Sequence, residues 1–296
     1  MDQKVTEMEI TKAKQLVIKA GRELSESGLI ARTWGNVSCR VDENTFVITA
    51  SGRNYMTLTE DEVIPVKMVD LSYEGDIKPS SEKKVHRAVY LLRPEADFII
   101  HTHQDNASAV SAAGIDVISF GDRYEGIGRE VICAEYGLPG TDRLCRNTAR
   151  AVEDSCGNAV IMKHHGTVCW GRDYEQAFTA ARSLEDACGA YLERMGVPSG
   201  AVKKFASYKK PYLRAYLDDY AQIVGPKMKI RADENGEPVV GNAEDAEAMK
   251  MIINKNCRAY FAAMLSPKGK PIGMAESILM RRVYLKKYSR LAKEKS

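Results

Sequence analysis

Several features that mark other classes of protein are missing from this chain of 296 residues. No apolar run approaches the roughly 20 residues that a membrane-spanning helix needs. The first residues, 1–7, lack the apolar segment of a secretory signal. The seven cysteines include no C-x-x-C pair, which is typical of reduced thiols rather than of a disulfide scaffold. We therefore expect a cytoplasmic protein with no membrane partner.

An excess of charge of one sign is also missing. The formal net charge is only +3, which is too small to indicate nucleic acid as a partner. With 44% hydrophobic and 28% charged residues, the composition is that of an ordinary globular protein. The length suits one large domain, or one domain with an extension.

Histidine is scarce, yet four of the five histidines stand at the ends of two short apolar runs that predict buried strands. One run leads into His101 and His103, and the other, residues 159–162, leads into His164 and His165. Side chains alternate between the two faces of a strand, so His101 and His103 point the same way. That geometry suits a divalent metal. If His101 and His103 are considered alone, the alternative is that they are buried histidines whose hydrogen bonds are satisfied within the core.

Three histidines with a fourth position left open are the composition of a catalytic zinc site rather than of a structural one. Of the adjacent pair one should bind the metal, and His165, directly before the turn at Gly166, has the freer approach. Glu82 offers a carboxylate that can fill the open position or act as a base. His86, four residues further on the same helix face, is interpreted as a packed or supporting side chain.

Three turns are rich in hydroxyl, amide and glycine residues, and the third opens a predicted helix. Such residues favour hairpin turns and helix caps, which is the simpler interpretation. The alternative is an anion cradle of hydroxyls and backbone N–H groups, with a helix N-terminus to attract a phosphate. The residues concerned are Thr33, Asn36, Ser51, Gly52, Ser80 and Ser81.

Helical periodicity and turn residues predict the remaining elements. The pattern breaks at 196–200, after which four tyrosines recur every four residues from Tyr208 to Tyr220. We expect a helix that opens at Pro211, leaves Tyr208 just outside it and carries the other three tyrosines on one face. The other expected helices span residues 9–28, 82–92, 106–113, 142–154, 173–195, 242–265 and 274–292.

Five short motifs stand in an order and spacing that resemble the class II aldolase/adducin family of sugar-phosphate aldolases and epimerases. The resemblance covers roughly residues 9–195. The motifs are Gly35-Asn-Val-Ser38, Ile48-Thr-Ala-Ser-Gly52, Pro79-Ser-Ser-Glu82, His101-Thr-His103 and His164-His-Gly166.

The resemblance implies an α/β fold with three α/β/α layers around a central, mostly antiparallel sheet. It implies a domain over residues 1–200, which leaves residues 201–296 as a mainly helical C-terminal extension, and a homotetramer. Zn²⁺, or another divalent ion such as Mn²⁺ or Co²⁺, would be held by His101, His103 and His165. Glu82 would be the acid/base carboxylate. The substrate phosphate would be held by Asn36, Ser51, Gly52, Ser80 and Ser81, with Thr33 as an addition.

The chain departs from the family pattern in two ways: in the loop that would supply a second acid/base group, and in its C-terminal extension. Relatives add a second acid/base group from the loop after the H-x-H pair, where this chain offers Asp122 and Tyr124. The extension after residue 200 is absent from the short aldolases. It can cover the site, lengthen an oligomer interface or supply a tyrosine to a neighbouring site.

These expectations describe a class II aldehyde-lyase that acts on a small phosphorylated sugar. Retro-aldol cleavage of a ketose phosphate through a metal-stabilised enediolate would release a dihydroxyacetone-phosphate-type product and an aldehyde. The same site also suits a sugar-phosphate 4-epimerase, a decarboxylase or a dehydratase. A non-catalytic assembly module of the adducin kind is the alternative outside enzymes.

Overall fold

The computed structural model describes residues 9–30, 34–121, 124–241 and 246–293, so Thr33 and Asp122 lie outside the described residues. The chain forms two compact units. The first comprises residues 1–104, 116–162 and 166–187, and the second comprises residues 105–115, 163–165 and 188–296. Each unit is described by itself.

A sheet forms the centre of the first unit, with eight strands in the described residues in the order β3-β2-β1-β4-β8-β7-β6-β5. Every neighbouring pair is antiparallel except β6 and β7, which are parallel. The strands are β1 (Gly35–Arg40), β2 (Thr45–Thr49), β3 (Val63–Lys67), β4 (Phe98–Thr102), β5 (Val117–Ser119), β6 (Glu130–Ala134), β7 (Ala159–Met162) and β8 (Gly166–Gly171).

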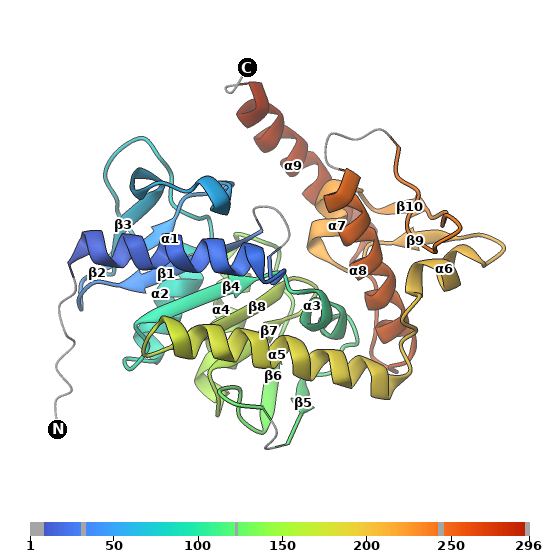
Figure 1. Cartoon of the computed structure of the whole chain (residues 1–296), viewed down its shortest axis with the longest axis horizontal. Coiled ribbons are helices and arrows are strands. Elements are labelled where there is room, and N and C mark those ends of the chain that lie inside the picture. The colour runs from blue at the N-terminus through green and yellow to red at the C-terminus, as the bar shows by residue number, and fades with distance from the viewer. Residues whose placement is uncertain (1–8, 31–33, 122–123, 242–245, 294–296) are drawn as a thin grey trace. The chain divides into compact units, whose positions relative to one another are not determined.

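Helices cover both faces of the sheet (Figure 1), which is why its central strands are continuous apolar runs rather than alternating ones. On one face, Phe46 and Ile48 of β2 join a buried cluster with α2 (Lys83–Leu92) and α4 (Asp142–Asp154). Thr141 caps the N-terminus of α4, because its hydroxyl accepts from the Leu144 N–H at 3.3 Å.

The opposite face carries α1 (Ile10–Glu26) and α5 (Tyr174–Met195). The buried side chains of α1 recur at helical spacing, as predicted. Phe98 of β4 packs edge-on against Tyr174 of α5, with ring centroids 5.6 Å apart, and the Tyr174 hydroxyl donates to Glu23 of α1. The predicted three-layer α/β/α fold is therefore confirmed. Two short 3₁₀ turns, η1 (Tyr55–Thr57) and η2 (Glu60–Glu62), complete this unit.

The second unit is mainly helical, as predicted for the extension. Its α3 packs against α8, and α7 packs against both α8 and α9. None of the helices in the described part of the chain is both long and apolar enough to cross a membrane. The elements are α3 (Asp105–Ser111), α6 (Ala201–Ala206), β9 (Tyr212–Arg214), α7 (Asp218–Ile223), β10 (Lys227–Lys229), α8 (Ala246–Met264) and α9 (Met274–Lys293).

The predicted tyrosine-bearing helix after Pro211 is wrong. Tyr212 lies in β9, which pairs with β10, and only Tyr220 lies in a helix, the short α7. The physical reason is a competing period of two: Leu213, Ala215 and Leu217 are at most 1% exposed, whereas Tyr212 is 55% exposed. The alternation of apolar residues decides the structure, and the four-residue recurrence of tyrosine does not.

Candidate metal centre and active site

His101 is the next-to-last residue of β4, and the sheet register defines its neighbours. It stands opposite Asn36 of β1 and Val168 of β8. Residues opposite each other in an antiparallel pair share a face, so the Asn36 and His101 side chains lie next to each other. His103 follows the strand end by one residue, and both histidines are buried, at 1% and 6% exposure.

His165 comes from the turn between β7 and β8, which is bracketed by the strand pair Met162↔Gly166. Its neighbour His164 has φ 62°, in the left-handed region that residues other than glycine rarely adopt. This backbone sends the two consecutive side chains to different partners. The Nδ1 of His164 donates to the Tyr216 carbonyl at 2.8 Å, while the Nδ1 of His165 lies 3.0 Å from a carboxylate oxygen of Asp218.

His101, His103 and His165 form a buried group that can hold a metal ion, with one ligand atom from each lying within 4.8 Å of the others. The predicted choice of His165 over His164 agrees with this group. The hydrogen bonds also suit a metal. His101 Nδ1 lies 2.7 Å from the Thr167 carbonyl oxygen, which only accepts, so Nδ1 carries the hydrogen and Nε2 carries the lone pair.

Glu82 lies beside this group. Its Oε2 is 3.0 Å from His101 Nε2 and accepts from the Asn36 amide at 3.0 Å. Glu82 itself is the N-cap residue of α2 and makes no side-chain capping bond. The Ser80 hydroxyl accepts from the Glu82 N–H at 3.2 Å, just before the helix begins. The Glu82 carboxylate is used for His101 and Asn36 and not for a cap bond.

A chain of buried hydrogen bonds holds the Glu82 carboxylate in place. A carboxylate only accepts, so Asn36 turns its NH₂ to Glu82 and its Oδ1 to His86 Nε2–H. His86 Nδ1 then accepts from the Ser38 hydroxyl at 2.6 Å, and Ser38 accepts from the Tyr90 hydroxyl at 2.7 Å.

His86 is held neutral in this chain. Burial, followed by the nearby His101, lowers the pKa of His86 from 6.5 to about 3, although Glu82 opposes the shift. The same burial raises the pKa of Tyr90 well above its ordinary value, which keeps the phenol protonated as a donor. The interpretation of His86 as a supporting side chain agrees with these contacts.

Sequence reasoning missed Ser38 and Tyr90. Ser38 follows Asn36 by two residues on β1 and therefore shares its face, and Tyr90 follows His86 by four residues on α2. The strand period of two could have indicated Ser38, and the helix spacing of four could have indicated Tyr90. Trp34, which stacks on His103 at a centroid distance of 6.5 Å, and Asp218 were also missed.

Two of the three predicted phosphate turns lie side by side. Ala50 and Pro79 form an isolated β-bridge, the Ser80 N–H donates to Thr49 at 3.0 Å, and the Ser51 hydroxyl donates to Pro79 at 3.5 Å. Ser51 is half-buried and Ser81 is exposed.

Gly52 follows in the left-handed region with φ 71°, where glycine fits without strain. Asn36 lies with Glu82 and His86 rather than in these turns. A phosphate-binding role for any of these residues stays a prediction.

The contacts of Tyr124 do not identify the second acid/base residue. This tyrosine is half-buried, and its ring packs edge-on against Phe120 with centroids 6.2 Å apart. With Asp122 outside the described residues, the catalytic role of either one stays a prediction.

Three buried imidazoles beside a buried carboxylate at the end of a sheet have the chemistry of a catalytic divalent-metal site. The comparison with known families agrees with this class. The sequence model described as "Class II Aldolase and Adducin N-terminal domain" matches residues 15–192. The chain therefore belongs to the class II aldolase/adducin family.

Solved structures provide a second comparison. An L-fuculose 1-phosphate aldolase matches with 28% identity and a TM-score of 0.59, over 64% of this chain and 90% of its own. The L-fuculose-1-phosphate aldolase from Thermus thermophilus matches with 24% identity and a TM-score of 0.52, over 62% and 94% of the two chains.

YgbL from Klebsiella pneumoniae matches with 22% identity and a TM-score of 0.53, over 63% of this chain and 91% of its own. Aldolase, epimerase and decarboxylase activities have been put forward for that protein. The latter two structures show that the fold is shared.

Proposed function

We propose that this protein is a metal-dependent aldolase that cleaves a ketose phosphate into a dihydroxyacetone-phosphate-type product and an aldehyde. The observation that carries the proposal is the position of Glu82, a buried carboxylate 3.0 Å from an imidazole of the three-histidine group. A carboxylate kept out of water next to three potential ligands is costly for a protein that uses the fold only as a scaffold.

The three histidines would hold a divalent ion through one ring nitrogen each. In His101 and His165 the Nδ1 atoms are used for hydrogen bonds, so Nε2 is the nitrogen that can bind the ion. When bound, the ion supplies a Lewis acid that polarises the substrate carbonyl and stabilises the negative charge that develops on its oxygen. Zinc is the ion we propose, with Mn²⁺ or Co²⁺ as alternatives.

Retro-aldol cleavage requires two proton transfers. The hydroxyl on the departing carbon loses its proton as the carbon–carbon bond breaks, and the electron pair of that bond passes to the carbon next to the carbonyl. That carbon then takes up a proton, which gives the triose phosphate. We assign the proton on the carbon to Glu82, which the Asn36–His86–Ser38 chain holds in place. Asp122 and Tyr124 are the candidates for the proton on the departing hydroxyl.

The substrate phosphate would bind at the adjoining turns of Ser51, Gly52, Ser80 and Ser81, with Thr33 and Asn36 as the further predicted contacts. The support is the pairing of the two turns through Ala50 and Pro79, which places backbone N–H groups and hydroxyls together. We further propose a catalytic domain over residues 1–200 with an extension over 201–296, assembled as a cytoplasmic homotetramer.

The test is a panel of fuculose, rhamnulose, ribulose and deoxypentulose phosphates, with released aldehyde and triose phosphate as the readout. Wild type loaded with zinc is expected to release triose phosphate from at least one of them. Glu82→Gln keeps the size of the side chain and removes the base, so we expect a 10²–10⁴-fold lower kcat with metal content unchanged. Ser81→Ala, at an exposed hydroxyl, is expected to raise KM rather than to lower kcat.

The outcomes separate the rival reactions. Stereochemical inversion without net cleavage indicates a 4-epimerase, and release of carbon dioxide from a phosphorylated acid indicates a decarboxylase. Metal binding without turnover of any of these substrates contradicts the aldolase, and absence of both metal binding and turnover indicates an assembly module.

A further inference from the structure

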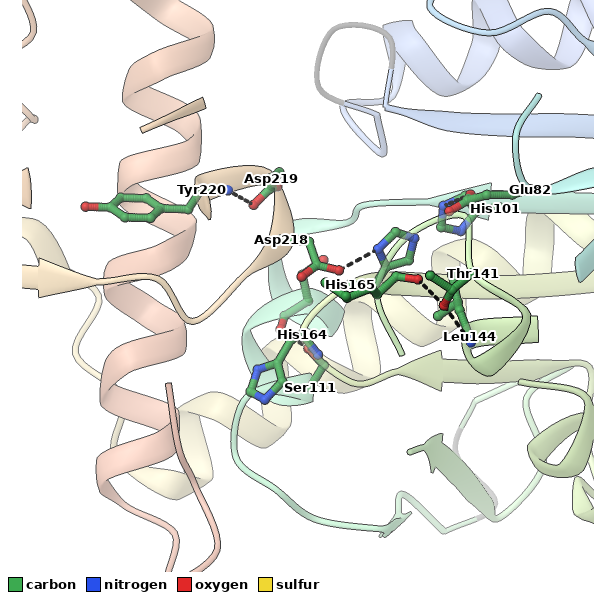
Figure 2. Close-up of polar contacts among 12 residues, drawn as sticks. Glu82, His101, Ser111, Thr141, Leu144, His164, His165, Asp218, Asp219 and Tyr220 are labelled. Carbon is green, nitrogen blue, oxygen red and sulfur yellow. Dashed lines mark hydrogen bonds and ion pairs between the residues drawn. The ribbon is translucent and has the colours of Figure 1, made fainter. Parts of the chain in front are cut away.

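Asp218 is the first residue of α7, in the part of the chain that follows the family match at residues 15–192. Its carboxylate Oδ2 lies 3.0 Å from Nδ1 of His165, and Figure 2 shows the side chain pointing at the imidazole ring. Asp218 is 0% exposed and His165 is 2% exposed, so water does not compete for this contact. Both residues belong to the second unit.

The backbone before Asp218 is anchored by α8. Asn256 of α8 accepts from the N–H groups of Tyr216 and Leu217 at 2.8 and 3.1 Å, and its NH₂ group donates to the Arg214 carbonyl at 2.8 Å. These three bonds use both the oxygen and the NH₂ group of the Asn256 side chain, which is buried. The segment that leads into Asp218 is therefore fixed independently of the histidine.

The residue after Asp218 is anchored as well. Asp219 pairs with Lys255 of α8 at 2.5 Å, and both side chains are about 1% exposed. An ion pair this well buried is sensitive to geometry and holds the start of α7 against α8. The carboxylate of Asp218 is thus presented from a rigid support.

The histidine turn is held from the same segment. The Asp218 N–H donates to the His164 carbonyl at 2.8 Å, and His164 Nδ1–H donates to the Tyr216 carbonyl at 2.8 Å. Ser111 of α3 accepts from the His164 N–H at 3.0 Å. These bonds stabilise the left-handed backbone of His164, which turns the next side chain, His165, toward Asp218.

We propose that Asp218 is a positioning residue for the metal site, supplied by the C-terminal extension. The carboxylate accepts the Nδ1 hydrogen of His165, which selects the tautomer with its lone pair on Nε2, fixes the ring plane and raises the basicity of the ligand nitrogen. This inference rests on the proposed binding of metal by His101, His103 and His165. The extension is then a part of the metal site, and not only a surface addition.

The experiment measures zinc affinity by competition with a chromophoric chelator, using full-length wild type, Asp218→Asn and Tyr220→Phe. Asparagine keeps the size of the side chain but removes the charge, and we expect zinc to bind about 10–100-fold more weakly. Tyr220→Phe is the matched control. It removes another buried hydrogen bond from α7, the one to the Leu213 carbonyl at 3.2 Å, without touching His165. Its zinc affinity is expected to equal that of wild type.

A second measurement does not depend on whether Asp218→Asn folds. Nitrogen-15 NMR of the histidine rings in wild-type apoprotein, with His165 assigned from His165→Gln, is expected to show hydrogen on Nδ1 of His165. Hydrogen on Nε2 would overturn the proposal. An unchanged zinc affinity in folded Asp218→Asn, or an equal loss in Tyr220→Phe, would overturn it as well. Failure of wild type itself to bind zinc would instead overturn the proposed function.

Discussion

At the scale of single residues, His86 decides how the Glu82 carboxylate is held. It lies in the middle of the buried chain that runs from Tyr90 through Ser38 and Asn36 to Glu82. Only the neutral ring can accept from Ser38 while it donates to Asn36, because a protonated imidazole has two donors and no acceptor. The chain therefore requires the neutral form, which agrees with the lowered pKa of His86.

His86→Gln is expected to change how stability depends on pH. In the unfolded chain His86 takes up a proton near its ordinary pKa of 6.5, whereas in the folded protein it does so only near pH 3. Between these values the unfolded state binds more protons, so acid lowers the free energy of unfolding by about 1.4 kcal/mol per pH unit for this group. The variant lacks this contribution, and its stability should fall less steeply between pH 6.5 and 4.

The measurement is urea unfolding of metal-free wild type and variant at several pH values. The difference in slope between the two proteins reports the titration of His86. Parallel pH profiles would contradict the neutral, buried state of this ring.

At the scale of elements, the position of His101 depends on the close approach of β4 and β8. Gly166 opens β8, and a Cβ at this position would lie 2.3 Å from the Thr102 carbonyl oxygen and 3.2 Å from Cε1 of His101. Backbone atoms cannot move away as the end of a flexible side chain can. A side chain at residue 166 would therefore separate the two strands where His101 projects.

Gly166→Ala is expected to destabilise the fold by about 1–3 kcal/mol, as overpacking does in a close-packed interior. It should also weaken zinc binding, because His101 is displaced. Gly241→Ala is the control, since no atom lies within 4 Å of a Cβ at that position. Denaturant unfolding and zinc competition check both variants, and a Gly166→Ala protein with unchanged stability would contradict the strand spacing.

Some of the helices and strands could be predicted from the sequence, and others could not. The apolar runs at 98–102 and 159–162 predicted the two strands, and alternation along the first predicted that His101 and His103 act together. The prediction of a helix after Pro211 is wrong, because the apolar residues around Leu213 alternate as in a strand while the tyrosines recur every four residues. Both periods are present in that segment, and the pairing of β9 with β10 decides between them.

At the scale of the whole molecule, the second unit contains a buried ion pair between two of its helices, α7 and α8. Lys255 and Asp219 are 2% and 1% exposed and pair at 2.5 Å. Asp105 lies near them, and its pKa is raised mainly by burial, while Lys255 and Arg258 act in the opposite direction. The pair joins α7 to α8 and fixes the segment that carries Asp218.

Lys255→Met is expected to destabilise the protein by about 3–5 kcal/mol, because it leaves the Asp219 carboxylate buried without its cation. The double variant Asp219→Asn/Lys255→Met should be less destabilised than the sum of the two single variants, since the carboxylate and its cation are removed together. Urea unfolding of the four proteins measures the coupling. Simple additivity would contradict an ion pair that is closed in the folded state.

Contacts of this kind lie beyond what one sequence predicts. His165 and Asp218 are 53 residues apart, and Lys255 and Asp219 are brought together by the packing of α8 on α7. No period or motif links such positions, because long-range packing creates the contact. The motifs of the first 195 residues were predictable because their chemistry follows strand ends and turns, whereas the support of His165 by the extension was not.

We propose that the three-histidine group and Glu82 form one metal-dependent active site. The most direct measurement is a titration of chelator-treated wild type with zinc while triose phosphate release is followed, with His103→Ala beside it. We expect that activity rises linearly and stops at about one zinc per chain, and that the variant stays inactive at this level of zinc. Cleavage that persists in the metal-free protein, or a zinc-loaded wild type that cleaves no sugar phosphate, would contradict it.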